Sequence, residues 1–212
     1  MFIEKPPRFI RSFFRKATWE MNNTQDIFIT FDDGPVPDIT EWTVKTMNEF
    51  EAKGTFFCVG DNARKYPHLI DYVKYNGHSI GNHTYNHING WRTSVTDYYN
   101  NVMLADEILH SRLFRPPYGR ITKPQMLQLS DFEIIMWDVL SVDYDSKLSG
   151  KKCINNVLKN VQGGSIVVFH DSLKASKNLF YALPKVLESL KNKGYTLSAI
   201  PNWQRNEVLA FH

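Results

Sequence analysis

The sequence predicts a single-domain α/β fold, a distorted (β/α)7 barrel. Two observations lead to this prediction. From residue 27 to residue 200, seven short apolar runs alternate with helix-like stretches, and polar or ionisable residues follow most of these runs. Alternating strands and helices indicate a parallel sheet with right-handed crossovers, and barrels of this type carry their chemistry at the carboxyl ends of the strands. Because several runs are short, we expect the barrel to be distorted.

The seven apolar runs are expected to form the strands. The first consists of β-branched and aromatic residues that favour a pleated backbone, and Gly34 and Pro35 end it in a turn. The runs are residues 27–31, 55–59, 79–81, 113–114, 133–137, 165–169 and 196–200.

Helices are expected between most of the strands, because apolar residues recur there every three or four positions. The expected helices are residues 38–50, 62–76, 93–112, 123–129, 151–161 and 178–193.

The composition is that of a globular protein with one domain. The chain has 212 residues, of which 42% are hydrophobic and 22% charged, enough to bury a substantial core. The formal net charge is only +3, so no nucleic-acid partner is expected. We find no run of about 18 apolar residues and expect no transmembrane helix. Two cysteines, Cys58 and Cys153, do not make a disulfide framework, and the compartment stays undetermined.

Residues 1–23 form a basic and aromatic extension ahead of the main domain, which spans residues 24–212. The extension lacks the uninterrupted apolar core of a signal peptide. We favour a short helix that packs on the outside of the barrel or closes its bottom. The alternative is a peripheral membrane contact, because basic and bulky apolar side chains interleave.

Ionisable residues that follow two different strands predict a metal site. Asp32 and Asp33 end the first strand, while His83 and His87 follow the third. On a helical turn, two histidines four residues apart face the same way, and one carboxylate completes a three-ligand site with open positions. Zinc suits such a site, and cobalt, nickel and manganese are alternatives. Of the remaining histidines, His78 is the one expected to support the ligands.

Other groups at the strand ends suit proton transfer. A metal lowers the pKa of bound water to about 7, and a neighbouring aspartate can take the remaining proton as a general base. Arg115 is expected to pair with that aspartate and hold it ionised. His170 is expected to act as a general acid with Asp143 as its partner, and the alternative is that His170 is a third metal histidine.

Five segments follow one another along the chain: residues 30–35 (TFDDGP), 83–87 (HTYNH), 115–119 (RPPYG), 137–144 and 166–170. In this order they resemble the motifs of the polysaccharide deacetylases, carbohydrate esterase family 4. The resemblance covers roughly residues 24–200 and is most specific in its first three motifs. The resemblance implies a distorted seven-stranded barrel and metal-dependent removal of N-acetyl groups from amino sugars, so that an acetylated glycan would be the substrate.

Carried over to this chain, the resemblance implies that Asp32 is the general base and that Arg115 positions it. Asp33, His83 and His87 would be the metal ligands. Adjacent residues of a strand point to opposite faces, so both aspartates can serve one site only if the backbone turns at Asp33.

The resemblance also implies roles for residues around the substrate. His170 would be the general acid tuned by Asp143, and the backbone N–H of Tyr118 would donate to the oxyanion. The walls around the sugar and its acetyl group would be formed by Pro116, Tyr118, Trp137, Tyr144 and Val168.

The fourth motif departs from the family pattern. Many members have an Asp-Trp pair in place of Asp143 and Tyr144, and a further aspartate in place of Leu140. Tyr144 retains an aromatic surface for the wall. Asp138 or Asp145 are therefore alternative or additional partners of the acid.

Three other functions are alternatives. The same site would serve an amidohydrolase that acts on cyclic amides or ureides. A carbohydrate-binding protein without catalysis is a second alternative, although the combined presence of ligands, base, arginine and acid argues against it. A haloacid-dehalogenase-like phosphatase would leave both histidines unexplained.

Overall fold

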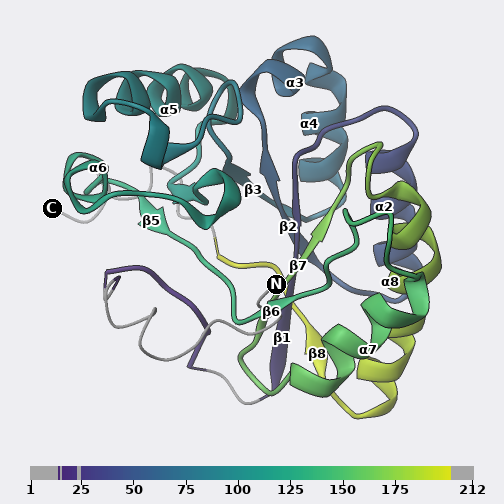
Figure 1. Cartoon of the computed structure of the whole chain (residues 1–212). Coiled ribbons are helices and arrows are strands. Elements are labelled where there is room, and N and C mark those ends of the chain that lie inside the picture. The colour runs from purple at the N-terminus through teal and green to yellow at the C-terminus, as the bar shows by residue number, and fades with distance from the viewer. Residues whose placement is uncertain (1–13, 15, 23–24, 202–212) are drawn as a thin grey trace, which may run out of the picture.

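The computed structural model describes residues 14, 16–22 and 25–201. Its centre is a curled sheet of parallel strands, in the order β5-β4-β3-β2-β1-β7-β6, and β8 pairs with the first two residues of β1 (Figure 1). The strands are β1 (Asp26–Asp32), β2 (Gly54–Cys58), β3 (Ser79–Asn82), β4 (Leu113–Phe114), β5 (Glu133–Ile134), β6 (Val139–Leu140), β7 (Ile166–His170) and β8 (Thr196–Leu197).

The curled parallel sheet confirms the predicted class of fold, with three differences in detail. The run 133–137 forms a strand only over Glu133–Ile134, and the short strand Val139–Leu140 was not predicted. The last predicted strand pairs with β1 and does not extend the sheet beyond β6. The described strands therefore form a barrel that is open between β5 and β6.

Helices follow most strands, as expected, and side-chain caps fix where several of them begin. Ser94 and Ser149 accept hydrogen bonds from the first turns of α5 and α7. The predicted helix 62–76 is two helices, because Pro67 has no N–H to continue α3 and instead begins α4. The helices are α2 (Ile39–Glu49), α3 (Gly60–Lys65), α4 (Pro67–Tyr75), α5 (Val95–Leu109), α6 (Lys123–Gln128), α7 (Gly150–Asn160) and α8 (Ser176–Asn192), with short 3-10 turns at Gly90–Arg92 and Pro117–Gly119.

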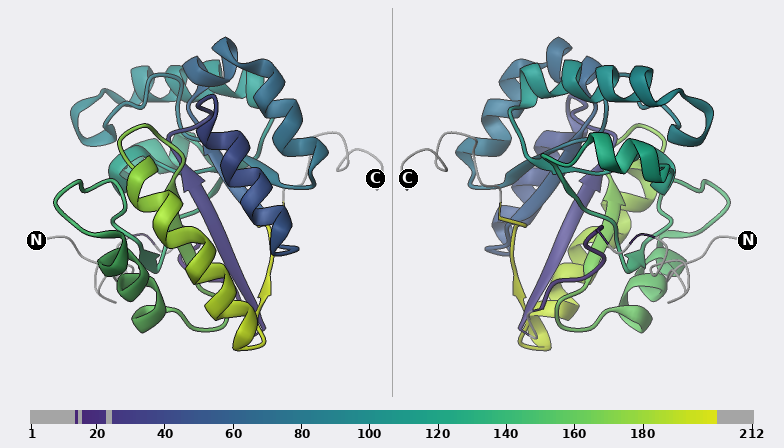
Figure 2. Two further views of the ribbon diagram at one scale, coloured as in Figure 1. Left: turned by 90° about the vertical axis from the view of Figure 1, so that its right-hand side faces the viewer. Right: turned by 90° about the vertical axis from the view of Figure 1, so that its left-hand side faces the viewer.

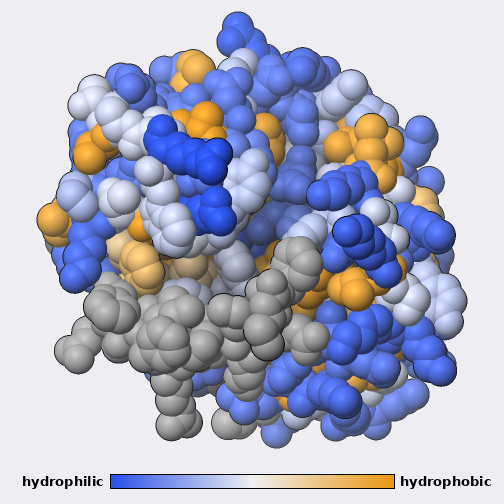
Figure 3. Space-filling view, viewed as in Figure 1, coloured by the Kyte–Doolittle hydropathy of each residue, from blue (hydrophilic) through white to orange (hydrophobic). Residues whose placement is uncertain are grey.

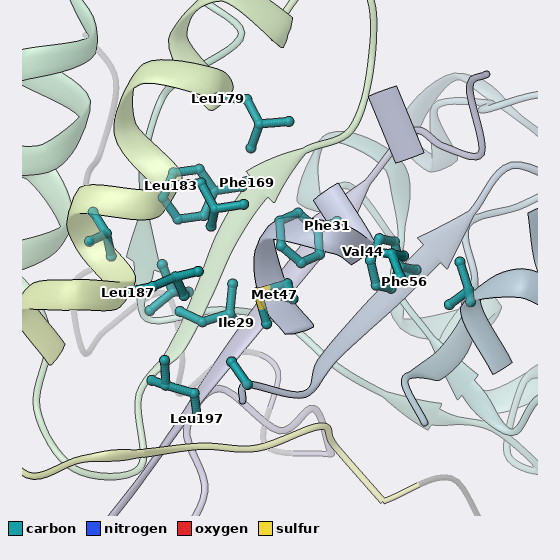
Figure 4. Close-up of a cluster of buried hydrophobic side chains, with 14 of the residues drawn as sticks. Ile29, Phe31, Val44, Met47, Phe56, Phe169, Leu179, Leu183, Leu187 and Leu197 are labelled. Atoms are coloured by element: carbon teal, nitrogen blue, oxygen red, sulfur yellow. The ribbon is translucent and has the colours of Figure 1, made fainter. Parts of the chain in front are cut away.

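The outward face of β1 packs against α2 and α8, which lie side by side over the strand (Figure 2). Ile29 and Phe31 are fully buried there, together with Met47 from α2 and Leu183 from α8 (Figure 4). Burial of this apolar surface, at about 25 cal/mol per Å2, stabilises the packing of α2 and α8 on β1.

The inward face of β1 carries Phe28, Thr30 and Asp32, because side chains alternate along a strand. Phe28 lies in a second apolar cluster with Phe57 and Ile166 from the neighbouring strands. This cluster packs inside the barrel. The alternation therefore brings Asp32 to the carboxyl end of the strand on the inner side.

The described part of the N-terminal extension lies against the sheet. Thr18 forms a parallel bridge with Ile135, Glu20 forms an antiparallel bridge with Ser165, and Trp19 is buried. Residues 1–13, on which the expected helix and the alternative membrane contact mainly depend, lie outside the described residues. Within the described part of the chain, no helix has both the length and the apolar character needed to span a bilayer.

Candidate active site

A cavity of about 540 Å3 opens at the carboxyl ends of the strands. Figure 3 shows a hollow with hydrophilic surface on both sides in the face seen in Figure 1. The cavity is lined by Asp32, Asp33, His83, His87, Tyr118, Arg120, Trp137, Leu140, Tyr144, Val168, His170 and Lys174.

Asp32 is held by a fully buried arginine. Arg115 Nη1 donates to Asp32 Oδ1 at 2.7 Å and to Thr30 Oγ1 at 2.6 Å. The rest of the guanidinium donates to the carbonyls of Ile135 and Met136 and lies 4.1 Å from the centre of the Phe57 ring. With these donors satisfied, the guanidinium orients the Asp32 carboxylate through a short charge-assisted hydrogen bond.

Asp33 turns into the same cavity because its backbone leaves the strand conformation. Its φ is 79°, in the left-handed region, and its carbonyl accepts a hydrogen bond from Asn62. The amide of Gly34 donates to Asp171 Oδ1 at 3.1 Å, and a Cβ at Gly34 would overlap that carboxylate. A glycine is therefore required where the turn meets Asp171, and the turn brings both aspartates to one site.

The two histidines also meet, but not on a helical turn as expected. Residues 83–88 form a loop in which Thr84 and His87 have φ of 61° and 54°. Side-chain oxygens replace the missing helical hydrogen bonds: Asn82 accepts from the amide of Thr84, and Asn101 from those of the next two residues. This loop brings the His83 and His87 rings to 5.1 Å between centroids.

Asp33, His83 and His87 fit a divalent metal. One ligand atom from each residue lies within 4.8 Å of the other two, and Asp33 Oδ1 is 3.1 Å from His87 Nε2 and 3.7 Å from His83 Nε2. His83 Nδ1 is 2.8 Å from the Arg115 carbonyl, so Nδ1 carries the proton and Nε2 is the ligand atom. His170 is not part of this group.

The protonation states of two of these residues also suit a metal. Burial lowers the pKa of His83 to about 4, which keeps its imidazole neutral. Burial raises the pKa of Asp33, but the hydrogen bond from His87 and the charges of the neighbouring histidines outweigh it, so the pKa lies well below its usual range. Metal ligands must be deprotonated, and both residues meet that requirement.

His170 is bound at two points by Asp143. Asp143 Oδ1 lies 2.8 Å from His170 Nδ1, and Oδ2 accepts from the backbone amide of His170 at 2.9 Å. Burial lowers the pKa of His170, but the charge and hydrogen bond of Asp143 outweigh it and raise the pKa to about 9. The two alternative partners of His170 bind elsewhere. Asp138 accepts hydrogen bonds from Ser165 and the amide of Ile166, and Asp145 accepts one from the amide of Lys147.

The predicted wall residues lie around the cavity, with one exception. Tyr118 packs edge-on against His87, and Tyr144 packs edge-on against His170. Pro116 is buried and does not line the cavity, and its carbonyl accepts from the amide of Gly119. No described residue accepts from the amide of Tyr118. The walls from the predicted set are Tyr118, Trp137, Tyr144 and Val168.

Three residues line the cavity that were not predicted to contact a substrate: Arg120, Leu140 and Lys174. Arg120 directly follows the segment 115–119, and Lys174 comes four residues after His170, so closeness in sequence was the only signal. The expectation for His78 was wrong. It precedes β3, at the opposite end of the strand from His83, and its Nδ1 accepts from the amide of Gly54.

Comparisons with known proteins agree with this geometry. Residues 20–136 match the polysaccharide deacetylase family. The chain is 33% identical over 192 residues to a peptidoglycan-N-acetylglucosamine deacetylase of Bacillus cereus, covering 85% of this chain and 68% of the relative. It is 28% identical over 199 residues to a chitooligosaccharide deacetylase of Azorhizobium caulinodans, covering 84% and 94%. A crystal structure of the Bc1960 peptidoglycan N-acetylglucosamine deacetylase superposes with a TM-score of 0.85 at 30% identity, covering 92% of this chain and 95% of the other.

Proposed function

The chain belongs to the polysaccharide deacetylase family, and from that premise we propose that it is a metal-dependent hydrolase that removes N-acetyl groups from the amino sugars of a glycan. The names of the bacterial relatives support N-acetylglucosamine as the sugar. The observation that carries the proposal is the convergence of Asp32, the group Asp33, His83 and His87, and His170 on one cavity.

Asp33, His83 and His87 would hold the metal. Two imidazole nitrogens and one carboxylate oxygen suit zinc, and cobalt, nickel and manganese accept the same ligands. A bound ion of this kind supplies Lewis-acid activation of water and of the acetyl carbonyl.

Asp32 would take the proton of the attacking water. Arg115 contacts its Oδ1, so Oδ2 is the oxygen that would accept the proton. Arg115 itself is held by Thr30 and by two backbone carbonyls, which fixes the direction of the carboxylate. General-base catalysis of this kind contributes roughly 100-fold to 10,000-fold in rate.

His170 would give a proton to the departing amine. Its Nδ1 is bound to Asp143, so Nε2 is the nitrogen that would donate the proton. The raised pKa of about 9 supports a protonated imidazole at neutral pH. The amide of Tyr118 would donate to the oxyanion that forms when water adds to the acetyl carbon. The products are acetate and a free amino sugar.

The proposal is tested by acetate release. Protein loaded with zinc is incubated with N-acetylglucosamine oligomers and, in parallel, with cyclic amides and ureides. Acetate from the oligomers, lost after chelation and restored by zinc, would support the proposal. Hydrolysis of cyclic amides without acetate release would replace it with the amidohydrolase alternative, and glycan binding without turnover would replace it with a binding protein.

A further inference from the structure

The side of the barrel on which β5 and β6 remain unpaired is crossed by a short segment ahead of β1, residues 17–21, here named the strap. Thr18 of the strap forms a parallel bridge with Ile135, just after β5, and Glu20 forms an antiparallel bridge with Ser165, just before β7. Figure 1 shows this segment in dark purple beside the chain that leads from β5 to β6. The strap therefore joins the two sides of the open barrel.

Backbone hydrogen bonds hold the strap against the end of β5. The amide of Thr18 donates to the Ile134 carbonyl at 2.9 Å, and the Thr18 carbonyl accepts from the amide of Met136 at 2.7 Å. Ile135, between these two partners, donates instead to the Phe114 carbonyl on the side of β4. This alternation is that of a parallel sheet, so Thr18 continues the sheet beyond β5.

The peptide group between Ile135 and Met136 connects the strap to Arg115. Its N–H belongs to Met136 and donates to Thr18, and its C=O belongs to Ile135 and accepts from Arg115 Nε at 3.2 Å. The N–H and C=O of a trans peptide group point in opposite directions. Thr18 and the guanidinium therefore lie on opposite sides of one planar group, and the two hydrogen bonds that share it polarise each other.

From Arg115 the connection continues to the base of the proposed reaction. Arg115 Nη2 donates to the Met136 carbonyl at 3.0 Å, and Nη1 donates to Asp32 Oδ1 at 2.7 Å. Because the guanidinium is planar, the carbonyls that hold Nε and Nη2 also determine where Nη1 lies. A displaced strap would move these carbonyls and, with them, the partner that orients Asp32.

We propose that Thr18 is a positioning residue for the base: the strap fixes the peptide group that orients Arg115, and Arg115 orients Asp32. The inference rests on the proposed function, in which Asp32 takes the proton of water. The family match begins at residue 20, so Thr18 lies ahead of the part of the chain that this match covers. Since both contacts of Thr18 with the end of β5 are made by its backbone, the course of the strap matters and the side chain does not.

Two substitutions at Thr18 separate the backbone from the side chain. Thr18→Pro removes the N–H that donates to Ile134 and so displaces the strap, whereas Thr18→Ala keeps both backbone contacts. The zinc-loaded full chains are assayed for acetate release from N-acetylglucosamine oligomers. Thr18→Pro should lower kcat by about 10-fold to 100-fold, the effect of a misplaced catalytic group, with KM and zinc content unchanged. Thr18→Ala should keep the parental kcat.

The side chain of Arg115 reports on the same contact without an assay of activity. Its Nε–H is buried and bonded to the Ile135 carbonyl, so its proton should give a nuclear magnetic resonance signal in the zinc-free protein. The chemical shift of this proton should change in Thr18→Pro and stay at the parental value in Thr18→Ala. A strap that only stabilises the fold would leave the chemical shift of Arg115 unchanged in both variants.

Hydrogen exchange in the parent protein tests the strap even if Thr18→Pro does not fold. The amide of Thr18 should be as strongly protected as the amides of β1, because it belongs to the same sheet. An amide of Thr18 that exchanges as fast as those of exposed loops would overturn the inference.

The acetate assay distinguishes failure of this inference from failure of the proposed function. A folded Thr18→Pro variant with the parental kcat and an unchanged Arg115 signal would overturn the role of Thr18 and retain the function. An equal loss of kcat in Thr18→Ala would also overturn that role. No acetate release by the parent protein would overturn both the proposed function and the role of Thr18 in it.

Discussion

Asp143 and His170 are joined twice, once through the imidazole and once through the backbone. Asp143 Oδ1 is 2.8 Å from Nδ1, and Oδ2 accepts from the amide of His170 at 2.9 Å. Asp143 is fully buried, and Ser141 donates to its Oδ1. The contact fixes both the orientation of the ring and the nitrogen that faces the cavity.

Asp143→Asn should move the alkaline limit of activity to lower pH. The pKa of His170 is raised from 6.5 to about 9, so its acid form is present up to that pH. Without the charge of Asp143, the pKa should fall by about one unit or more. Acetate release measured from pH 6 to pH 10 checks this, with Asp145→Asn as control. If Asp143→Asn had the same alkaline limit of activity as the parent, the pairing of Asp143 with His170 would be contradicted.

The same pair should make the free energy of unfolding depend on pH. A histidine whose pKa is raised in the folded state stabilises fully below its unfolded value of about 6.5. That contribution is lost as pH rises toward 9. Urea denaturation of the parent and of His170→Gln at several pH values should show the difference between them shrinking over this range. A constant difference would contradict the raised pKa.

Arg115→Met should destabilise the fold as well as the site. The guanidinium is fully buried, and its loss would leave Asp32 buried without its cation. Breaking a buried pair in this way costs about 3–5 kcal/mol. Urea denaturation measures the loss, and Arg92→Met on the surface should change the free energy of unfolding by less than about 0.5 kcal/mol. Equal free energies of unfolding for the Arg115 and Arg92 variants would contradict the buried ion pair between Arg115 and Asp32.

His83→Gln should abolish tight binding of zinc. His83 offers Nε2 while its Nδ1 contacts the Arg115 carbonyl, so the substitution removes both contacts. Zinc retained after dialysis should fall from about one per chain to near zero. Zinc at 100 times its dissociation constant should raise the free energy of unfolding of the parent by about 2.7 kcal/mol. This gain should vanish in the His83 variant. His68→Gln, on the surface, should retain the metal, and a His83 variant that does the same would refute the ligand assignment.

Gly34→Ala should weaken both the fold and the metal site. The new methyl group would overlap the Asp171 carboxylate, which binds the Gly34 amide and Thr40. Overpacking of this kind costs about 1–3 kcal/mol. Gly194→Ala is the control: a φ of 83° at Gly194 strains an alanine there, but nothing lies within 4 Å of the new methyl group. Only the Gly34 variant should also lose zinc affinity, because the turn presents Asp33.

Much of the fold could be predicted because its signals are local. The first strand, residues 27–31, consists of β-branched and aromatic residues followed by a turn at Gly34, and the structure extends it by only one residue at each end. Strand β6 was missed because two residues, Val139 and Leu140, carry no periodicity. The break at Pro67 was missed because apolar spacing continued across it, although the missing N–H is a local signal.

The candidate site was only partly predictable, because contacts between loops decide it. The turn at Asp33 followed from the need for both aspartates to face one cavity. The loop that brings His83 and His87 together depends on the side chain of Asn101, in a different element, and four-residue spacing alone wrongly indicated a helix. Arg120 and Lys174 were missed because no pattern marks a cation that lines a cavity.

Asp32→Asn tests the assignment of Asp32 as the general base. Asparagine keeps the shape of the side chain and an oxygen for Arg115, so the variant should fold and bind zinc, although the buried guanidinium loses its counter-charge and the protein some stability. Acetate release from N-acetylglucosamine oligomers by the zinc-loaded variant should fall at least about 100-fold, the contribution of a general base. A variant that binds one zinc and releases acetate at the parental rate would contradict the account of the site.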